Sequence, residues 1–121
     1  MTGADLSGGT LGTGAVNEIF RALSDPTRRS VVERLSVQSS SVSELAASYP
    51  MALPSFVEHL KVLEGAGLVR SRKVGRVRTY ELRAEQLKFA EDWLGRQRSI
   101  WERRLDRLDS YLLALNKEKS K

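Results

Sequence analysis

The sequence predicts a mainly α-helical fold with one small two-stranded antiparallel β hairpin, and three observations support this prediction. Apolar residues recur at intervals of three and four in segments between Ala15 and Leu63, the spacing of amphipathic helices. Residues 68–82 instead consist of two strand-like runs around a central turn. From Ala84 the helical spacing returns and continues to about Leu115. The expected order is therefore short helices, a hairpin and one long helix.

Two signals mark the first pair of helices. Apolar residues on one side of residues 15–23 form a single stripe, which needs another element to cover it. After this helix, Asp25 and Pro26 stand at the head of the next one. An aspartate at the N-cap accepts a backbone N–H, and a proline in the first turn forfeits no hydrogen bond. The second helix is therefore expected to run from Pro26 to about Leu35.

The next two helices predict a helix-turn-helix. Residues 41–44, Ser-Val-Ser-Glu, match a capping box in which the serine hydroxyl and the glutamate carboxylate satisfy each other's backbone donors. A short helix over residues 42–48 follows, and Pro54 marks the start of a fourth helix, which ends with Gly67 as its left-handed cap. Two short helices joined by a tight turn, the second of which stops before a hairpin, are typical of this organisation.

The hairpin that follows holds the excess positive charge of the chain. Its strands are predicted at residues 68–72 and 77–82, and its turn at residues 73–76. Residues 70–83 contain six lysines and arginines against one glutamate, a net charge of +5, which equals the formal net charge of the whole chain. A positive field confined to one ribbon indicates an element that follows phosphates, although charge can also protect a sheet edge. The first interpretation makes the hairpin the wing of a winged helix-turn-helix.

The long C-terminal helix, residues 84–116, is predicted to mediate dimerisation. Many of its apolar residues lie three or four apart along one stripe, and such a helix is on the order of 45 Å long. A small winged domain cannot cover this stripe, so pairing with a second copy is the simplest way to bury it. Two tryptophans near the stripe would also suit an effector pocket between subunits. The predicted dimer interface comprises Val16, Ile19, Phe20, Leu87, Leu94, Trp101, Leu105 and Leu108.

Composition limits the remaining possibilities. The 121 residues suffice for one small core. The chain is expected to comprise a flexible tail (1–14), the winged helix-turn-helix domain (15–83), the dimerisation helix (84–116) and a basic tail (117–121). No signal peptide or membrane span is evident, which indicates a cytoplasmic protein. With no cysteine and one histidine, no metal site or cofactor is predicted. We find no nucleophile with a base, no carboxylate constellation and no phosphate-binding glycine loop, and expect no enzymatic activity.

Four motifs occur in a characteristic order: ALSDPTRRSVVERL, SVSELA, LPSFVEHLKVLEGAGLV and GRVRTYEL. With them the chain, over roughly residues 15–83, closely resembles the arsenic-repressor (ArsR-type) family of bacterial winged-helix transcription regulators. The helix that follows looks like the tail of a metal-independent branch. The resemblance implies a homodimer, formed largely by the first and last helices, that binds an inverted-repeat operator in double-stranded DNA and usually represses transcription.

The chain departs from this family in two places. The best-known members sense metals with cysteines in the helix that here reads SVSELAAS, or with histidine and acidic residues in the last helix, and the chain has neither set. Metal sensing is therefore not implied. In the fourth helix the branch usually has a small hydroxyl residue at the start, and serine followed by lysine or glutamine further on. Here those positions are Ala52, Val57 and Glu58, so an uncapped start and a carboxylate on the reading face are expected.

Two sets of side chains are candidates to contact DNA. On the fourth helix, a valine can touch a thymine methyl, a glutamate can accept from a cytosine amino group, and histidine or serine can bond a base edge; the alternative is an ordinary solvated face. On the wing, basic side chains can reach phosphates and the minor groove. Residues at helix starts can add phosphate contacts, or act locally as caps. The predicted contacts are Ser55, Val57, Glu58, His59, Lys61, Arg72, Lys73, Arg76 and Arg78, with Arg28, Arg29 and Ser43 as additional phosphate contacts.

The sequence therefore predicts a sequence-specific DNA-binding transcription regulator. The expected form is a homodimeric repressor that reads the major groove with residues 53–64 and grips DNA with a wing at residues 68–82. The alternative is a winged-helix protein-interaction module with a helical docking surface, which the valine and glutamate on the reading helix would suit. The effector stays open, because a small organic ligand, a regulatory protein and no effector all agree with the sequence.

Overall fold

The computed structural model describes residues 14–119 of the chain. Of the predicted tails, residues 1–13 and 120–121 lie outside this range. The chain divides into two compact units, Met1–Ala90 and Glu91–Lys121, and each is described by itself. No helix among the described residues is long and apolar enough to cross a membrane.

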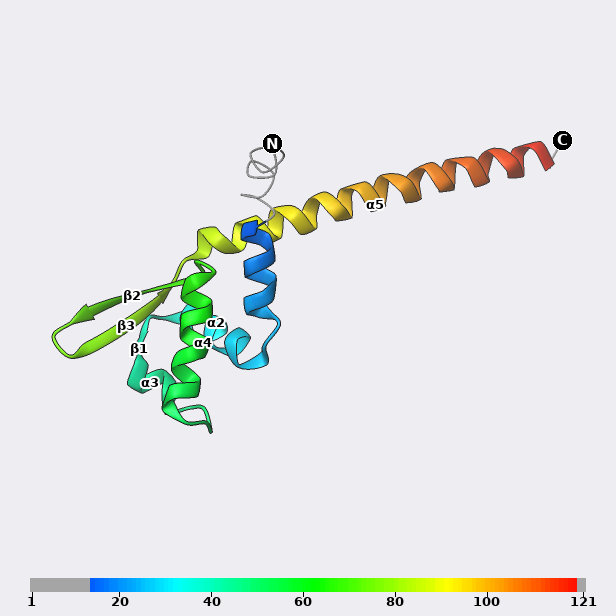
Figure 1. The fold of residues 1–121 in the computed structure, drawn as a ribbon. Helices are drawn as coiled ribbons and strands as arrows, with labels where there is room; N and C mark the ends of the chain where they lie inside the picture. Colours follow the sequence, from blue (N-terminus) through cyan, green and yellow to red (C-terminus); the bar gives the residue numbers. More distant parts are fainter. Residues whose placement is uncertain (1–13, 120–121) are drawn as a thin grey trace, which may run out of the picture. The chain divides into compact units, whose positions relative to one another are not determined.

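Helices make up most of the described chain (Figure 1). The first is a helical segment at residues 14–23. It is followed by α2 (Pro26–Val37), α3 (Val42–Ala46), α4 (Leu53–Gly65) and α5 (Ala84–Lys119). All the helices predicted from the sequence are thus present, although α3 ends earlier and α5 continues further than the sequence indicates.

The helix starts follow the predicted capping. The Asp25 carboxylate accepts the amide N–H of Arg28 at 3.0 Å. In the capping box, the Glu44 amide donates to the Ser41 hydroxyl at 3.1 Å and the Ser41 amide donates to the Glu44 carboxylate at 2.8 Å. The amide of Ser41 thereby holds the pKa of Glu44 below its ordinary range. Ala52 offers α4 no side-chain cap, as the sequence predicts, so packing must hold that end of the helix.

The strands form one antiparallel sheet with the order β1-β3-β2. They are β1 (Ser40–Ser41), β2 (Val69–Val74) and β3 (Val77–Leu82). The sequence predicts only the hairpin of β2 and β3, and the third strand corrects this prediction. Ser40 pairs with Tyr80 and is buried. Two serines give no periodic signal, because their pairing uses backbone groups and depends on tertiary context.

The turn of the hairpin is shorter than predicted. Lys73 pairs with Arg78, and Val74 pairs with Val77. The strands therefore include residues that the sequence assigns to the turn, and only residues 75–76 connect them. Gly75 supplies a positive φ of 62°, which two-residue hairpin turns require. Strand pairing thus extends almost to the tip of the wing.

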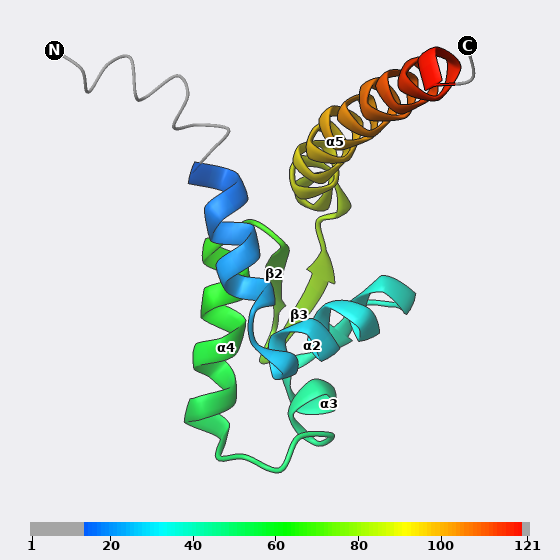
Figure 2. The same cartoon turned by 90° about the vertical axis from the view of Figure 1, so that its right-hand side faces the viewer.

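A single apolar core fixes α4 in the first unit. Phe56, Leu60 and Leu63 are fully buried, as the sequence predicts, and they share one cluster with residues from every helix of this unit and from the sheet. The ring of Tyr49 stacks on Phe56 with ring centres 5.0 Å apart. Figure 2 shows α4 beside the first helical segment. Because one face of α4 is buried in this way, its opposite face is left to solvent.

The first helical segment also contributes to this core. Val16 is 6% exposed and Ile19 is 0% exposed within the subunit. Both side chains thus face the interior of the first unit, and their place in a dimer interface stays a prediction.

Gly67→Ala should destabilise the protein, whereas Gly65→Ala should not. Gly67 has a φ of 76°, at which an alanine is strained by on the order of 1 kcal/mol. A Cβ there would also lie 2.6 Å from the Nε2 of Gln86, a flexible group that can move aside. An added Cβ at Gly65, the last residue of α4, meets nothing within 4 Å, and alanine favours a helix by up to about 1 kcal/mol. The free energy of unfolding in urea, at one protein concentration, checks this pair, and equal effects would contradict the role of Gly67.

Candidate DNA interface

The outer face of α4 carries most of the predicted reading residues. Ser55, Glu58 and Lys61 are exposed, and Val57 is half-buried. The Lys61 Nζ lies 3.4 Å from the Glu58 Oε2 in an exposed ion pair. Such pairs contribute little to stability, and this one leaves the face nearly neutral. The helix therefore presents small, apolar and carboxylate groups rather than a cationic stripe.

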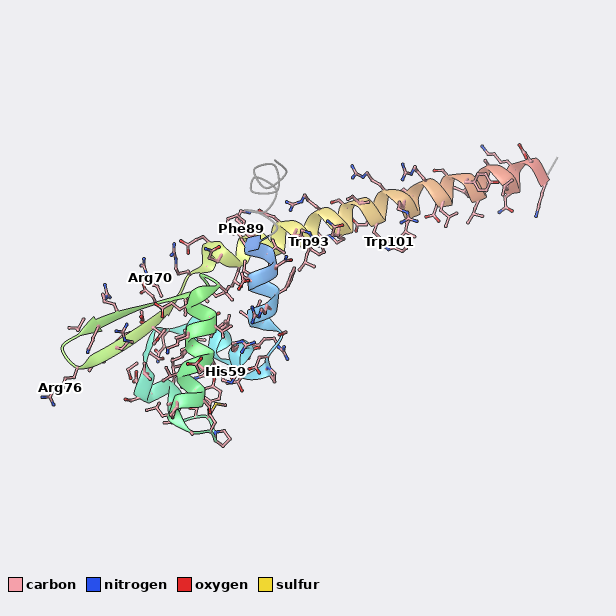
Figure 3. All side chains as sticks on the ribbon, viewed as in Figure 1. His59, Arg70, Arg76, Phe89, Trp93 and Trp101 are labelled. Carbon is pink, nitrogen blue, oxygen red and sulfur yellow. The ribbon has the colours of Figure 1, made fainter. Side chains whose placement is uncertain are left out.

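His59 does not share this exposed face. Its side chain is 23% exposed, and its Nδ1 lies 3.7 Å from the Asp25 Oδ2 and 3.1 Å from the Arg28 Nη1. Figure 3 shows His59 among the helices of the first unit, whereas Arg76 stands at the free end of the hairpin. The structure thus places His59 against the head of α2, and not with the other candidates for base contacts.

The predicted phosphate contacts at helix starts have local partners. The Arg28 Nε and Nη2 donate to the backbone carbonyls of residues 22 and 21 at 2.7 Å and 3.2 Å, and the Arg29 Nη1 donates to the carbonyl of residue 23 at 2.8 Å. The last carbonyls of a helix lack partners within that helix, so both arginines close the end of the first helical segment. A phosphate would have to compete with these bonds. Ser43, in contrast, is exposed in the first turn of α3.

The carboxyl group of Asp25 shares this corner. Burial opposes its ionisation, but the backbone hydrogen bond from Arg28, the nearby imidazole of His59 and the charge of Arg28 hold the pKa of Asp25 below its ordinary value of 3.8. Among the residues that the structure describes, no cluster of three or more side chains suited to a metal ion occurs. The hydrogen bonds of Arg28 make this corner a polar junction that joins α2, α4 and the first helical segment.

Strand pairing sorts the basic residues of the wing onto two faces. Lys73 stands directly opposite Arg78 on one face, and Arg72 stands opposite Thr79 on the other. Arg76 occupies the turn (Figure 3). Like charges directly opposite each other destabilise a sheet. The tip of the wing is therefore electrostatically unfavourable unless an anion lies beside it.

Acidic and hydroxyl partners lie toward the base of the wing. Arg70 forms a hydrogen-bonded ion pair with Glu81, and this bond holds the pKa of Glu81 below its usual range. The Arg78 Nη1 donates to the Ser71 hydroxyl at 2.7 Å, and Ser71 donates in turn to the Glu64 carboxylate of α4 at 3.1 Å. This chain of hydrogen bonds ties the wing to α4.

Two features of the wing follow from these partners. Lys73 and Arg76 have no hydrogen-bond or ion-pair partner within residues 14–119. Glu64 and Ser71 are functional candidates that the sequence does not single out, because they meet only across the junction of α4 and β2. The basic groups without protein partners thus lie near the tip, whereas Arg70 and Arg78 have partners closer to the base.

The second unit presents the apolar side chains predicted for dimerisation. Figure 3 shows Trp93 and Trp101 on α5. The Arg104 guanidinium lies 5.5 Å from the centre of the Trp101 ring. In the first unit, Phe20 is exposed, while Leu87 packs partly against the core. Exposed fractions between 40% and 54% are found for Leu94, Trp101, Leu105 and Leu108.

Known proteins similar to this chain are transcription regulators. A family model described as a helix-turn-helix domain matches residues 23–72. The chain is 46% identical over 63 residues to the HTH-type transcriptional regulator Rv2034 of Mycobacterium tuberculosis, a match that covers 52% of the chain and 59% of that protein. It is 28% identical to the transcriptional repressor SdpR of Bacillus subtilis, over 65% of the chain and 88% of the repressor. It is also 34% identical to the regulator YuzN of Bacillus subtilis, over 67% of the chain and 97% of that protein.

Solved structures agree with this likeness. The crystal structure of an ArsR family transcriptional regulator superposes with a TM-score of 0.72 at 48% identity, covering 74% of this chain and 93% of that one. An ArsR-like transcriptional regulator from Rhodococcus gives a TM-score of 0.70 at 33% identity, covering 79% of this chain and 91% of that one. Both matches extend over nearly the whole of the solved chains.

Asp25→Asn should destabilise the protein less than Asp25→Ala at about pH 7. Asparagine keeps an oxygen that accepts the Arg28 amide, whereas alanine loses the cap at a cost of about 1 kcal/mol. The charge of the native carboxylate adds a second contribution. Because folding lowers the pKa from 3.8, this contribution is present above that value and is lost as the pH falls through the lowered pKa of the folded state. Urea unfolding over an acid pH series checks this, and a constant difference between wild type and Asp25→Asn would contradict it.

Proposed function

Because the chain belongs to the ArsR family of helix-turn-helix transcriptional regulators, we propose that it is a homodimeric repressor that binds an inverted-repeat operator. Regulators of this family bind DNA and usually form dimers. The relative SdpR carries the name of a transcriptional repressor, which supports repression as the direction of control.

The observation that carries the proposal is that a basic wing and an exposed helix face belong to one packed unit. The buried stripe of α4 holds the helix in the core, and the hydrogen bonds from Arg78 through Ser71 to Glu64 brace the wing against it. A helix fits the major groove of B-DNA, and a wing beside it reaches the flanking backbone. In this arrangement the wing supplies most of the affinity for DNA, and α4 supplies the sequence specificity.

Sequence preference is proposed to come from the outer face of α4. Val57 can contact a thymine methyl, Ser55 can bond a base edge or a phosphate, and Glu58 can accept from a cytosine amino group. The ion pair of Glu58 with Lys61 is exposed, so it opens at little cost. A Glu58 side chain that meets no cytosine is repelled by phosphates, and this repulsion would discriminate against other bases.

Dimerisation is proposed to use the exposed apolar side chains of α5. The second unit, Glu91–Lys121, offers large apolar groups that are half-exposed in the subunit. Burial of such groups stabilises association by roughly 25 cal/mol per Å² of apolar surface. A two-fold dimer then presents two copies of α4 to two half-sites, which accounts for an inverted repeat.

Selection of bound fragments from the source genome tests this function. The expected result is a set of fragments that share an inverted repeat with half-sites about one helical turn apart, which the purified protein retards in a gel. A promoter that contains the repeat should become more active when the protein is removed. Failure to retard any DNA at low salt, together with stable complexes with other proteins, would favour the protein-interaction module instead.

Arg76→Ala should weaken operator binding more than Arg70→Ala, although each removes one positive charge. Arg76 lies at the tip of the wing without a partner in residues 14–119, whereas Arg70 is neutralised by Glu81. Each phosphate contact contributes about 0.9 to the slope of log affinity against log salt, so a dimer that loses both Arg76 contacts should lose about 1.8. Arg76→Ala combined with Arg78→Ala should flatten the slope further. Fluorescence anisotropy on a mapped operator measures these slopes, and equal slopes for the Arg70 and Arg76 variants would remove Arg76 from the contacts.

Aspartate at both Trp101 and Leu105 should convert the dimer to a monomer. Truncation of a central apolar residue in an interface often costs about 2 kcal/mol or more, and a buried carboxylate adds a desolvation cost. Val37→Asp is the matched control, because Val37 is 83% exposed on α2 and lies outside the proposed interface. Sedimentation equilibrium gives the mass of each variant. A Trp101 and Leu105 double variant that remains dimeric would exclude this part of α5 from the interface.

A further inference from the structure

His59 makes a tertiary contact that distinguishes it from the other predicted reading residues. Its Nδ1 lies 3.1 Å from the Arg28 Nη1, on a residue 31 positions away in the chain, and 3.7 Å from the Asp25 Oδ2. This contact and the hydrogen bond of Glu64 with the wing connect α4 side chains to the rest of the first unit. Since α4 has no side-chain cap at its start, the His59 contact is well placed to fix that half of the helix.

The partner of His59 decides how the ring is protonated. An arginine guanidinium only donates hydrogen bonds and keeps its charge. The Nδ1 atom that faces it must therefore accept, which requires a neutral ring with its proton on Nε2. Arg28 is fixed in turn, because its other nitrogens donate to the carbonyls of Ala22 and Arg21 at 2.7 Å and 3.2 Å. The guanidinium thus presents Nη1 to α4 from a preset position.

We propose that His59 is a positioning residue: its Nδ1 accepts the Arg28 hydrogen bond that sets the reading helix α4 against α2, and its ring does not read bases. The inference rests on the proposed DNA-binding function and deepens it. It also replaces the base contact that the sequence predicts for His59. Specificity then falls to the exposed side chains of α4, and His59 acts on DNA only through the angle of the helix.

Asparagine and glutamine at position 59 separate positioning from base reading. His59→Asn places an amide oxygen near the position of Nδ1, whereas His59→Gln places its oxygen near that of Nε2. The asparagine variant is expected to bind the operator within about threefold of wild type, because it keeps an acceptor for the Arg28 hydrogen bond. The glutamine variant is expected to bind about tenfold or more weakly, as loss of a hydrogen bond to a charged group would cause. Circular dichroism and urea unfolding confirm that both variants are folded before they are compared.

Two outcomes of this comparison would overturn the inference. The first is equally weak binding by the asparagine and glutamine variants. The second is an asparagine variant that prefers a different base within a half-site, because that result assigns base reading to the ring.

Nitrogen NMR of the free wild-type protein tests the geometry without DNA or variants. His59 is the one histidine in the sequence, so the imidazole signals belong to it alone. The expected spectrum at neutral pH has the proton on Nε2 and a bare, hydrogen-bonded Nδ1; a proton on Nδ1 would overturn the inference. Absence of DNA binding by the wild type would overturn the proposed function and this inference together, whereas the tautomer and the variants bear on this inference alone.

Discussion

The buried stripe of α4 is the contact on which the rest of the first unit depends. Phe56, Leu60 and Leu63 have almost no exposed surface, and each contributes about 1.5–3 kcal/mol by its burial. Their spacing also sets the rotation of the helix about its axis, so that Ser55 and Glu58 must face solvent. A helix that enters a groove has to be held from one side only. Apolar burial achieves this without using any group on the opposite face.

The wing carries positive charges near its tip that do not contribute to the stability of the fold. Near its base, Arg70 is neutralised by Glu81, while the guanidinium of Arg78 donates to Ser71, which lies closer to the base than Arg78 does. Toward the tip, Lys73 stands directly opposite Arg78, a like-charge pair that costs several tenths of a kcal/mol in the free protein. In the proposed complex with DNA, a phosphate between these two cations would reverse the sign of the interaction. The unfavourable field of the free wing is thus part of the energy that binding would release, and salt would screen it.

Local signals predict the helices and their ends, whereas contacts between distant segments escape them. The Asp25 cap and the left-handed Gly67 are confirmed because each acts within a few residues of its own helix. Strand β1 is missed, because it consists of two serines that pair with a distant strand. Helical spacing likewise predicts that Ser55 is exposed, but it leaves His59 at the margin of the buried stripe. The contact with Arg28 shows that the ring turns inward. Helical spacing cannot predict this contact, because it joins two residues that are far apart in the sequence.

In the proposed dimer, α5 controls DNA affinity without contacting DNA. One wing and one reading helix offer few phosphate contacts. Joining two such units makes the second half-site an intramolecular target, with an effective concentration that reaches the millimolar range for short connections. The half-exposed apolar side chains of the second unit would supply the association energy, and association is linked to operator binding by mass action. An effector that alters the packing of α5 would therefore change operator occupancy by changing how the two subunits associate. It would leave the reading face of α4 unchanged.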